Sequence, residues 1–155
     1  KRSRVRSRRA GSRLMSNWFR AALVAALLIP APALAQTQSL AGSWELRAMN
    51  AAFGCMITGQ ATLTPTRTQG VYTAAMTTRE TCGDVVGGPV DQHCTVSQSA
   101  IRISVLCTVT HIDPVRDYLP DDFELVVSTP NRLTGLLTAN WNAPAEWRRT
   151  TAAIS

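Results

Sequence analysis

Four cysteines, set within runs of alternating apolar and polar residues, constrain this chain more than any other feature. They occupy positions 55, 82, 94 and 107, and none has the C-x-x-C spacing of zinc or thioredoxin-like sites. An even number of cysteines in an exported chain predicts two disulfides. Alternation with a period of two is typical of β-strands that bury one face. We therefore expect antiparallel strands joined by disulfides.

Strand register favours one pairing of these cysteines. With Cys55 opposite Cys82, residue 61 faces 76, residue 63 faces 74, and turn-forming residues stand at the turn, 67–70. With Cys94 opposite Cys107, the turn falls at 99–102, and one face collects Val96, Ile101, Ile103, Val105 and Val109. A slip of one residue would move these side chains to the other face. We therefore favour Cys55–Cys82 with Cys94–Cys107 over Cys82–Cys94 with Cys55–Cys107.

The same patterns predict the fold class. Strands are expected at 42–49, 55–63, 71–78, 90–98, 101–111, 123–127, 133–141 and 145–149, with loops at 82–89 and 112–120. About 120 residues are enough for one domain with a modest core. The prediction is an all-β fold, a small antiparallel eight-stranded up-and-down barrel, with a β-sandwich as the alternative. Closing the barrel would remove exposed strand edges.

The first 35 residues have the pattern of an export signal. Residues 1–14 form an upstream basic segment, which we expect to be absent from the mature protein. Residues 15–35 combine a positive region, an apolar run and the small-residue triplet Ala33-Leu34-Ala35. The apolar run contains prolines and is shorter than the about 20 residues of a membrane span. We therefore expect a signal peptide, a mature domain at 36–155 without a membrane anchor, and a periplasmic or secreted bacterial protein.

Charge narrows the range of partners. Eight of the 16 Lys and Arg residues precede Gln36 and all 10 acidic residues follow it, so the mature domain has no lysine and a net charge of −2. Nucleic acid and anionic lipid both require a basic surface. The expected partner is instead a small apolar ligand or an extracytoplasmic protein, for example a protease.

The two ends of the mature domain resemble known small barrels. Gly42-Ser43-Trp44 is similar to the opening of lipocalin-like (calycin) barrels. The closing strands of such barrels are similar to 122–125, 132–135 and Trp147-Arg148-Arg149. The resemblance implies that Arg148 or Arg149 stacks on Trp44. The nearest family in function is the Inh-type metalloprotease inhibitors, periplasmic eight-stranded barrels that begin similarly. That resemblance implies protease contacts by Gln36, Thr37, Gln38 and Ser39.

An apolar cavity inside the barrel is one candidate ligand site. Gly59, Ala61 and Ala74 are small residues expected to point inward, where they would leave room for a small ligand. Larger side chains would line the cavity, namely Trp44, Tyr72, Met76, Phe123 and Trp141. The alternative is a core that these same side chains fill.

Catalytic and metal-binding patterns are weak. His93 and His111 are expected on opposite faces of one hairpin, which disfavours a shared metal site. Oxygen ligands for Ca²⁺ could come from Asp113, Asp117, Asp121 and Asp122, but their spacing differs from that of an EF-hand. No nucleophile elbow, P-loop or H-E-x-x-H motif occurs. We therefore predict a non-enzymatic binding module without cofactor or metal, with an Inh-type inhibitor as the alternative and a small secreted hydrolase as the second alternative.

Overall fold

Nine antiparallel strands make up the regular structure of residues 38–113, 117–139 and 142–150, which the computed structural model describes. The strands are β1 (Gly42–Asn50), β2 (Cys55–Pro65), β3 (Val71–Cys82), β4 (Val85–Val86), β5 (Val90–Ser99), β6 (Arg102–Ile112), β7 (Phe123–Thr129), β8 (Arg132–Leu137) and β9 (Ala143–Arg149). No helix in these ranges is long and apolar enough to cross a membrane. The expected leader lies outside the described residues, as do Gln36, Thr37 and Trp141.

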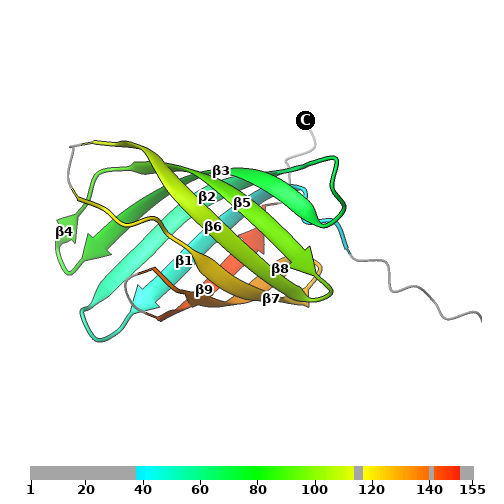
Figure 1. Cartoon of the computed structure of the whole chain (residues 1–155). Helices are drawn as coiled ribbons and strands as arrows, with labels where there is room; N and C mark the ends of the chain where they lie inside the picture. The colour runs from blue at the N-terminus through cyan, green and yellow to red at the C-terminus, as the bar shows by residue number, and fades with distance from the viewer. Residues whose placement is uncertain (1–37, 114–116, 140–141, 151–155) are drawn as a thin grey trace, which may run out of the picture. The chain divides into compact units, whose positions relative to one another are not determined.

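Eight of the strands close into a barrel (Figure 1). Each of β1, β2, β3, β5, β6, β7, β8 and β9 pairs with the next in this order, and β9 returns to pair with β1. Because neighbours in sequence are neighbours in the sheet and all pairings are antiparallel, the topology is up-and-down. The two residues of β4 add a short strand to the end of β3. The predicted eight-stranded barrel is confirmed, and the sandwich alternative is wrong.

Alternate side chains of each long strand fill the barrel interior. In β1, for example, Trp44, Leu46 and Ala48 are buried while Glu45 and Arg47 between them are exposed. The buried apolar residues form one cluster, whose largest members are Trp44, Trp147, Phe123, Leu40, Met76, Ile103, Leu133 and Leu137. Full burial of a Leu, Ile, Met or Phe side chain contributes about 1.5–3 kcal/mol. This cluster is therefore the main source of the barrel's stability.

Both disulfides join neighbouring strands in the predicted pairing. Cys55 of β2 is bonded to Cys82 of β3, and Cys94 of β5 is bonded to Cys107 of β6. The register around them is also as predicted, with residue 61 opposite 76, 63 opposite 74 and 96 opposite 105. The alternative pairing is wrong. Two disulfides indicate an oxidising environment outside the cytoplasm.

Several strand ends differ from the predicted ones, and three details matter here. The stretch 82–89, predicted as a loop, contains β4, and β8 ends at Leu137 instead of residue 141. Ile101, predicted to point inward, is 61% exposed because it lies in the turn between β5 and β6, next to Ala100 with its φ of 53°. Turn residues leave the alternation of the strands that they connect, so an apolar side chain there need not face the core.

A β-bulge in β6 changes the face of one histidine. Asp91 pairs with His111, and the register shifts at the next residue of β5, so that Thr110 is an extra residue in β6. An extra residue moves the alternation by one position. His111 is therefore exposed on the outer wall, as is His93, and the prediction of opposite faces is wrong.

Two glycines allow close approaches between neighbouring strands. A Cβ atom at Gly59 would overlap the backbone oxygen of Thr77, and a Cβ atom at Gly135 would overlap that of Glu124. Glycine at such positions lets a barrel sheet bend sharply. Gly59 therefore serves strand packing, and the prediction that it leaves room for a ligand is wrong.

Candidate ligand-binding site

One end of the barrel, which we call the closed end, is sealed by Trp44 and the chain that precedes β1. The fully buried indole of Trp44 donates a hydrogen bond to the backbone oxygen of Leu40 at 2.9 Å. The guanidinium carbon of Arg149 lies 4.5 Å from the centroid of the Trp44 ring, a cation–π contact. Arg149 also donates hydrogen bonds to the backbone oxygens of Ser39 and Ala41. The stacking that the lipocalin resemblance implies is thus present, and Arg149 provides it.

The described residues of the predicted protease-contact segment are bound to this closed end. The side chain of Gln38 donates to the backbone oxygen of Pro130 at 2.6 Å, and its backbone oxygen accepts from Gln98 at 3.2 Å. The backbone oxygen of Ser39 accepts from Arg149 at 2.8 Å. These bonds hold the segment against β5, β9 and the turn between β7 and β8.

The side chains predicted to line a cavity belong to the packed core. Trp44 and Phe123 have no exposed surface, Met76 is 2% exposed and Tyr72 is 7% exposed. Phe123 stands edge-on to Trp147, with ring centroids 5.2 Å apart. The indole N–H of Trp147 is buried without a hydrogen-bond partner among the described residues, which costs about 1–3 kcal/mol. None of these side chains lines the pocket that lies at the opposite end of the barrel. That they contact a ligand stays a prediction.

The opposite end, which we call the mouth, contains a pocket of about 520 Å³. The mouth is formed by the β1–β2 turn, β4 with its flanking turns, and residues 117–122 and 138–139 of the β6–β7 and β8–β9 connections (Figure 1). Buried side chains of Ile57 and Leu137 form the apolar floor, and the remaining lining residues are Glu80, Asp117, Tyr118, Leu119, Asp121 and Ala139. The volume is typical of small-molecule sites. A hollow of about 680 Å³ on the outer wall of β1, β2 and β9 is more open.

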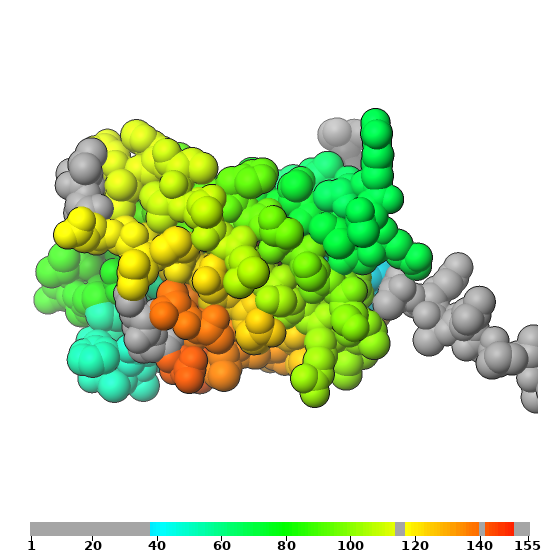
Figure 2. All heavy atoms as spheres, viewed as in Figure 1, coloured from blue at the N-terminus to red at the C-terminus, as the bar shows by residue number. Residues whose placement is uncertain are grey.

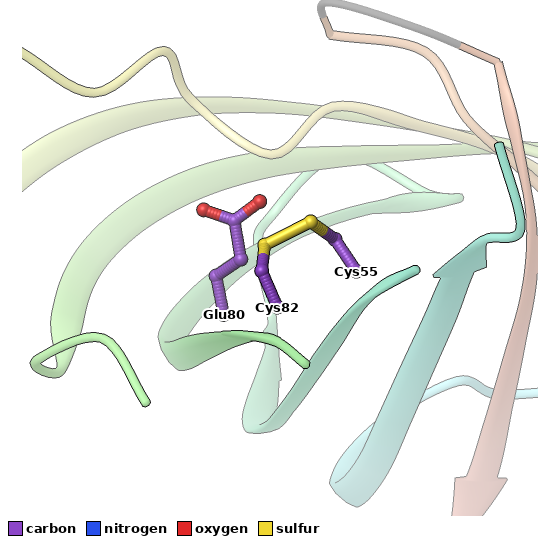
Figure 3. Close-up of side chains that lie close together, drawn as sticks. All are labelled: Cys55, Glu80 and Cys82. Atoms are coloured by element: carbon purple, nitrogen blue, oxygen red, sulfur yellow. A yellow bond between two sulfur atoms is a disulfide. The ribbon is translucent and has the colours of Figure 1, made fainter. Parts of the chain in front are cut away.

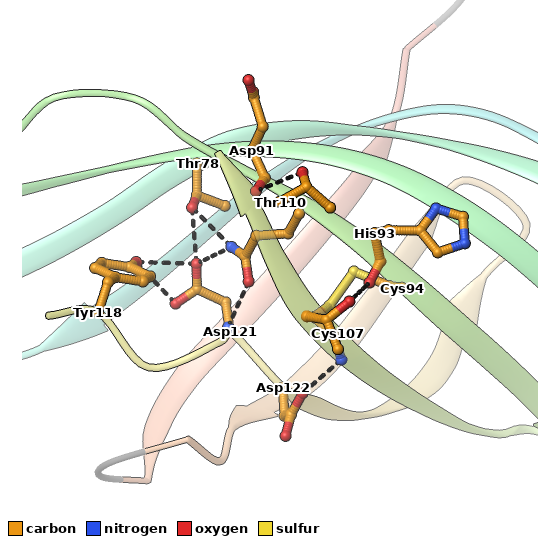
Figure 4. Close-up of a disulfide and its surroundings, with 11 residues drawn as sticks. Thr78, Asp91, His93, Cys94, Cys107, Thr110, Tyr118, Asp121 and Asp122 are labelled. Carbon is orange, nitrogen blue, oxygen red and sulfur yellow. Dashed lines mark hydrogen bonds between the residues drawn. A yellow bond between two sulfur atoms is a disulfide. The ribbon is translucent and has the colours of Figure 1, made fainter. Parts of the chain in front are cut away.

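Residues 117–122, which we call the strap, form one wall of the pocket and are fixed to the barrel by Asp121 (Figure 4). The Asp121 carboxylate accepts hydrogen bonds from the Thr78 hydroxyl at 2.7 Å, the Gln92 amide at 2.6 Å and the Tyr118 hydroxyl at 3.0 Å. The backbone N–H of Asp121 donates to the side-chain oxygen of Gln92 at 2.8 Å. This buried network ties the strap to β3 and β5.

Burial changes the acid–base properties of this network. Desolvation raises the pKa of the Asp121 carboxyl above its usual value, hydrogen bonds from Thr78, Gln92 and Tyr118 oppose the rise, and the charge of Glu80 adds to it. Desolvation also raises the pKa of Tyr118, and the charge of Asp121 is the next cause. In both groups, burial thus disfavours the charged form.

The aspartates considered as calcium ligands include two that attach the strap. Asp121 accepts the hydrogen bonds described above, and Asp122 accepts one from the backbone N–H of Cys107 at 2.7 Å (Figure 4). Within the described residues, the loop aspartates do not form a group of three converging ligands. The acidic loop is thus partly structural, because its carboxylates hold the strap to β3, β5 and β6.

Glu80 lies beside the disulfide at the mouth (Figure 3). One of its carboxylate oxygens and the sulfurs of Cys55 and Cys82 all lie within 4.8 Å of one another. Sulfurs in a disulfide are not thiolates, so this group of three is not a metal site. In the described ranges the ion pairs all involve Glu146, and none neutralises Glu80.

Exposed apolar side chains surround the mouth. Phe53 in the β1–β2 turn is 74% exposed, Val85 and Val86 of β4 are 71% and 59% exposed, and Leu119 of the strap is 55% exposed. Figure 2 shows these segments, in cyan, green and yellow, gathered at one end of the molecule. Exposed apolar side chains grouped at one end of a molecule favour a binding surface there.

Sequence reasoning missed the residues that build this pocket wall. Thr78 and Gln92 occupy inward positions of β3 and β5, and both are buried. A polar residue at a predicted core position near a strand end was the available signal, because a buried polar group needs a partner. The partner, Asp121, comes from a loop whose path the alternation does not predict.

Comparison with known proteins supports the fold. No family model and no curated protein matches the chain. A de novo designed fluorescence-activating β-barrel is similar, with 18% identity and a TM-score of 0.55, over 74% of this chain and 96% of that one. The redesigned barrel mFAP1, in a structure with DFHBI bound, has 18% identity and a TM-score of 0.52, over 72% and 94%. The chain is therefore a closed antiparallel β-barrel of the same architecture as these designs.

Proposed function

We propose that this protein is an exported, non-enzymatic binding module that takes one small ligand into the pocket at the mouth. The observation that most supports this proposal is the pocket of about 520 Å³, with Ile57 and Leu137 as its floor and the strap as one wall. Binding sites combine apolar lining with a few placed polar groups, and the Asp121 network supplies the latter. The similar barrel mFAP1 has a structure with DFHBI bound, which supports the proposal that a barrel of this architecture can bind a small ligand.

We also propose that the protein is a lipocalin-like barrel of the bacterial periplasm or exterior. The cation–π contact of Arg149 with Trp44 supports the resemblance on which this assignment rests. The two disulfides support an oxidising compartment, and the leader pattern supports export.

A filled pocket tests the binding function. Ala139 lines the pocket just after the end of β8, so Ala139→Trp places an indole in the ligand volume. Ala75→Trp adds the same group to the exposed outer wall of β3, away from the pocket, and is the matched control. Ligands found by thermal-shift screening of the disulfide-bonded protein should lose affinity at least about tenfold in Ala139→Trp only. Equal binding by both variants, or no ligand in the screen, contradicts the proposal.

The Inh-type inhibitor alternative requires a free N-terminal segment instead of a pocket. An inhibitory segment must enter a protease cleft, whereas Gln38 and Ser39 are hydrogen-bonded to the closed end. Deleting residues 36–39 distinguishes the two functions, because the pocket lies at the other end of the barrel. Inhibition of a bacterial metalloprotease by the intact protein, and its loss on deletion, would favour the inhibitor.

We propose no catalytic role for the histidines. His93 and His111 are exposed on the outer wall and do not line the pocket. Esterase or glycosidase activity that disappears in His93→Ala or His111→Ala would instead support the hydrolase alternative.

A further inference from the structure

The pocket at the mouth carries carboxylates that no described cationic side chain pairs with. Glu80, Asp117 and Asp121 line it, and no arginine or lysine does so among the described residues. Neither of the ion pairs in this part of the chain involves any of the three. Asp121 is bound by the neutral groups of the strap network. Within the part of the chain that the structure describes, the pocket therefore combines an apolar floor with unpaired carboxylates.

Charge is also distributed unevenly along the barrel. Acidic residues gather in the loops and strand ends of the mouth, namely Glu80, Asp84, Asp113, Asp117, Asp121 and Asp122. Five of the seven described arginines lie near the closed end, namely Arg67, Arg102, Arg132, Arg148 and Arg149, while Arg47 lies within β1 and Arg79 lies on the outer wall of β3 beside Glu80. Clefts lined by one sign of charge concentrate ligands of the opposite sign. Most charges of the described residues thus act in the same direction as the pocket lining.

We infer that the ligand of this pocket is an organic cation, an ammonium group carried on an apolar body. The inference rests on the proposed binding function and specifies its ligand class. The apolar body packs on Ile57, Leu119 and Leu137 at the floor and rim, and the ammonium group lies against Glu80 and Asp117. A fatty acid would bring its own carboxylate to these groups and be repelled, and a neutral ligand would leave their charge unpaired.

A metal ion fits the same pocket less well. Calcium takes six to eight oxygen ligands, whereas within the described residues the only converging group of three is Cys55, Glu80 and Cys82, two of which are bonded to each other. The apolar floor makes no useful contact with a hydrated ion, but it gains from burying a hydrocarbon surface. The floor and the carboxylates together therefore select an amphiphilic cation.

Probes that share one decyl chain separate charge from apolar binding. Decyltrimethylammonium, decanol and decanoate are titrated below their micelle concentrations into the disulfide-bonded protein. Binding is measured by calorimetry and by amide shifts of pocket residues. We expect the ammonium probe to bind about tenfold more tightly than decanol, decanoate to bind most weakly, and the preference to fall as salt is added.

Two matched variants locate the charge effect. Glu80→Gln should weaken binding of decyltrimethylammonium about tenfold and leave decanol unchanged. Glu124→Gln removes the same charge from the outer wall and should change neither affinity by more than about twofold.

The outcomes separate this inference from the function on which it rests. Decanol or decanoate binding at the pocket as tightly as the ammonium probe overturns the ligand class and leaves the binding function standing. If Ca²⁺ displaces the ammonium probe from the same residues, and NaCl at the same ionic strength does not, the ligand class is wrong and the pocket binds a metal ion. Failure of all three probes to shift pocket amides overturns the inference, and the Ala139→Trp screen then decides the binding function separately.

Discussion

At the closed end of the barrel, the inward positions carry Trp44, Leu63 and Val96, whereas at the mouth the inward positions of β3 and β5 carry Thr78 and Gln92. The same strands run through both ends, so the backbone does not explain the difference. Apolar side chains pack from all sides and leave no space, while polar side chains require partners in fixed directions. The comparison shows how one barrel devotes one end to stability and leaves volume for a ligand at the other.

The largest expected effect is at the closed end. Trp44→Ala should lower the free energy of unfolding by about 3–5 kcal/mol, because it leaves a cavity and removes the ring beneath Arg149. Leu119→Ala at the rim is the comparison, since its exposed side chain should matter by less than about 1 kcal/mol. Urea unfolding followed by circular dichroism measures both. Equal losses of unfolding free energy in the two variants would mean that the closed end and the mouth contribute equally to stability.

The disulfides should come next. Cys94→Ala with Cys107→Ala should lower the free energy of unfolding by about 3 kcal/mol, the value for a closed loop of this length. Removing Cys55 and Cys82 in the same way should have a similar effect on stability and should also speed hydrogen exchange at the mouth, where that bond lies. Denaturation and amide exchange measure the two effects, and faster exchange at the closed end instead would contradict the assignment.

Asp121→Asn should have an intermediate effect that depends on pH. Placing amide hydrogens against the donors of Thr78 and Gln92 should cost about 1–3 kcal/mol. The folded-state pKa of Asp121 lies above the ordinary 3.8, so its protonation favours the fold. The advantage of the wild type over the variant is therefore greatest below pH 3.8, and it decreases as pH rises through the folded pKa. Unfolding measured across this range tests the sign, and an advantage that grows with pH would refute it.

Glu80→Gln should have the smallest effect on stability, within about 0.5 kcal/mol. Because the charge of Glu80 raises the pKa of both Asp121 and Tyr118, its removal should lower both values. Carboxyl carbon shifts in a pH titration measure the change at Asp121. An unchanged Asp121 pKa together with a large loss of stability would show that Glu80 serves the fold and not the pocket.

Particular residues show how far sequence reasoning reached. The pairing of Cys55 with Cys82 followed from alternation across a short turn, and the contact between Arg149 and Trp44 followed from resemblance. The prediction for Ile101 was wrong because an apolar residue in a turn cannot be told by alternation from one at the start of the next strand. His111 was misplaced because one bulged residue reverses a face without a signal in the pattern.

The sequence by itself determined the eight barrel strands in outline, both disulfides and the register around them, because hairpin partners are close in the chain and each strand shows which of its faces is apolar. Only the tertiary structure decided where the pocket lies. Closing the barrel brings together Ile57, Glu80, Asp121 and Leu137 from three strands and a loop. Hydrogen bonds across these elements then hold the strap in place, and no local pattern in the chain specifies contacts between residues so far apart.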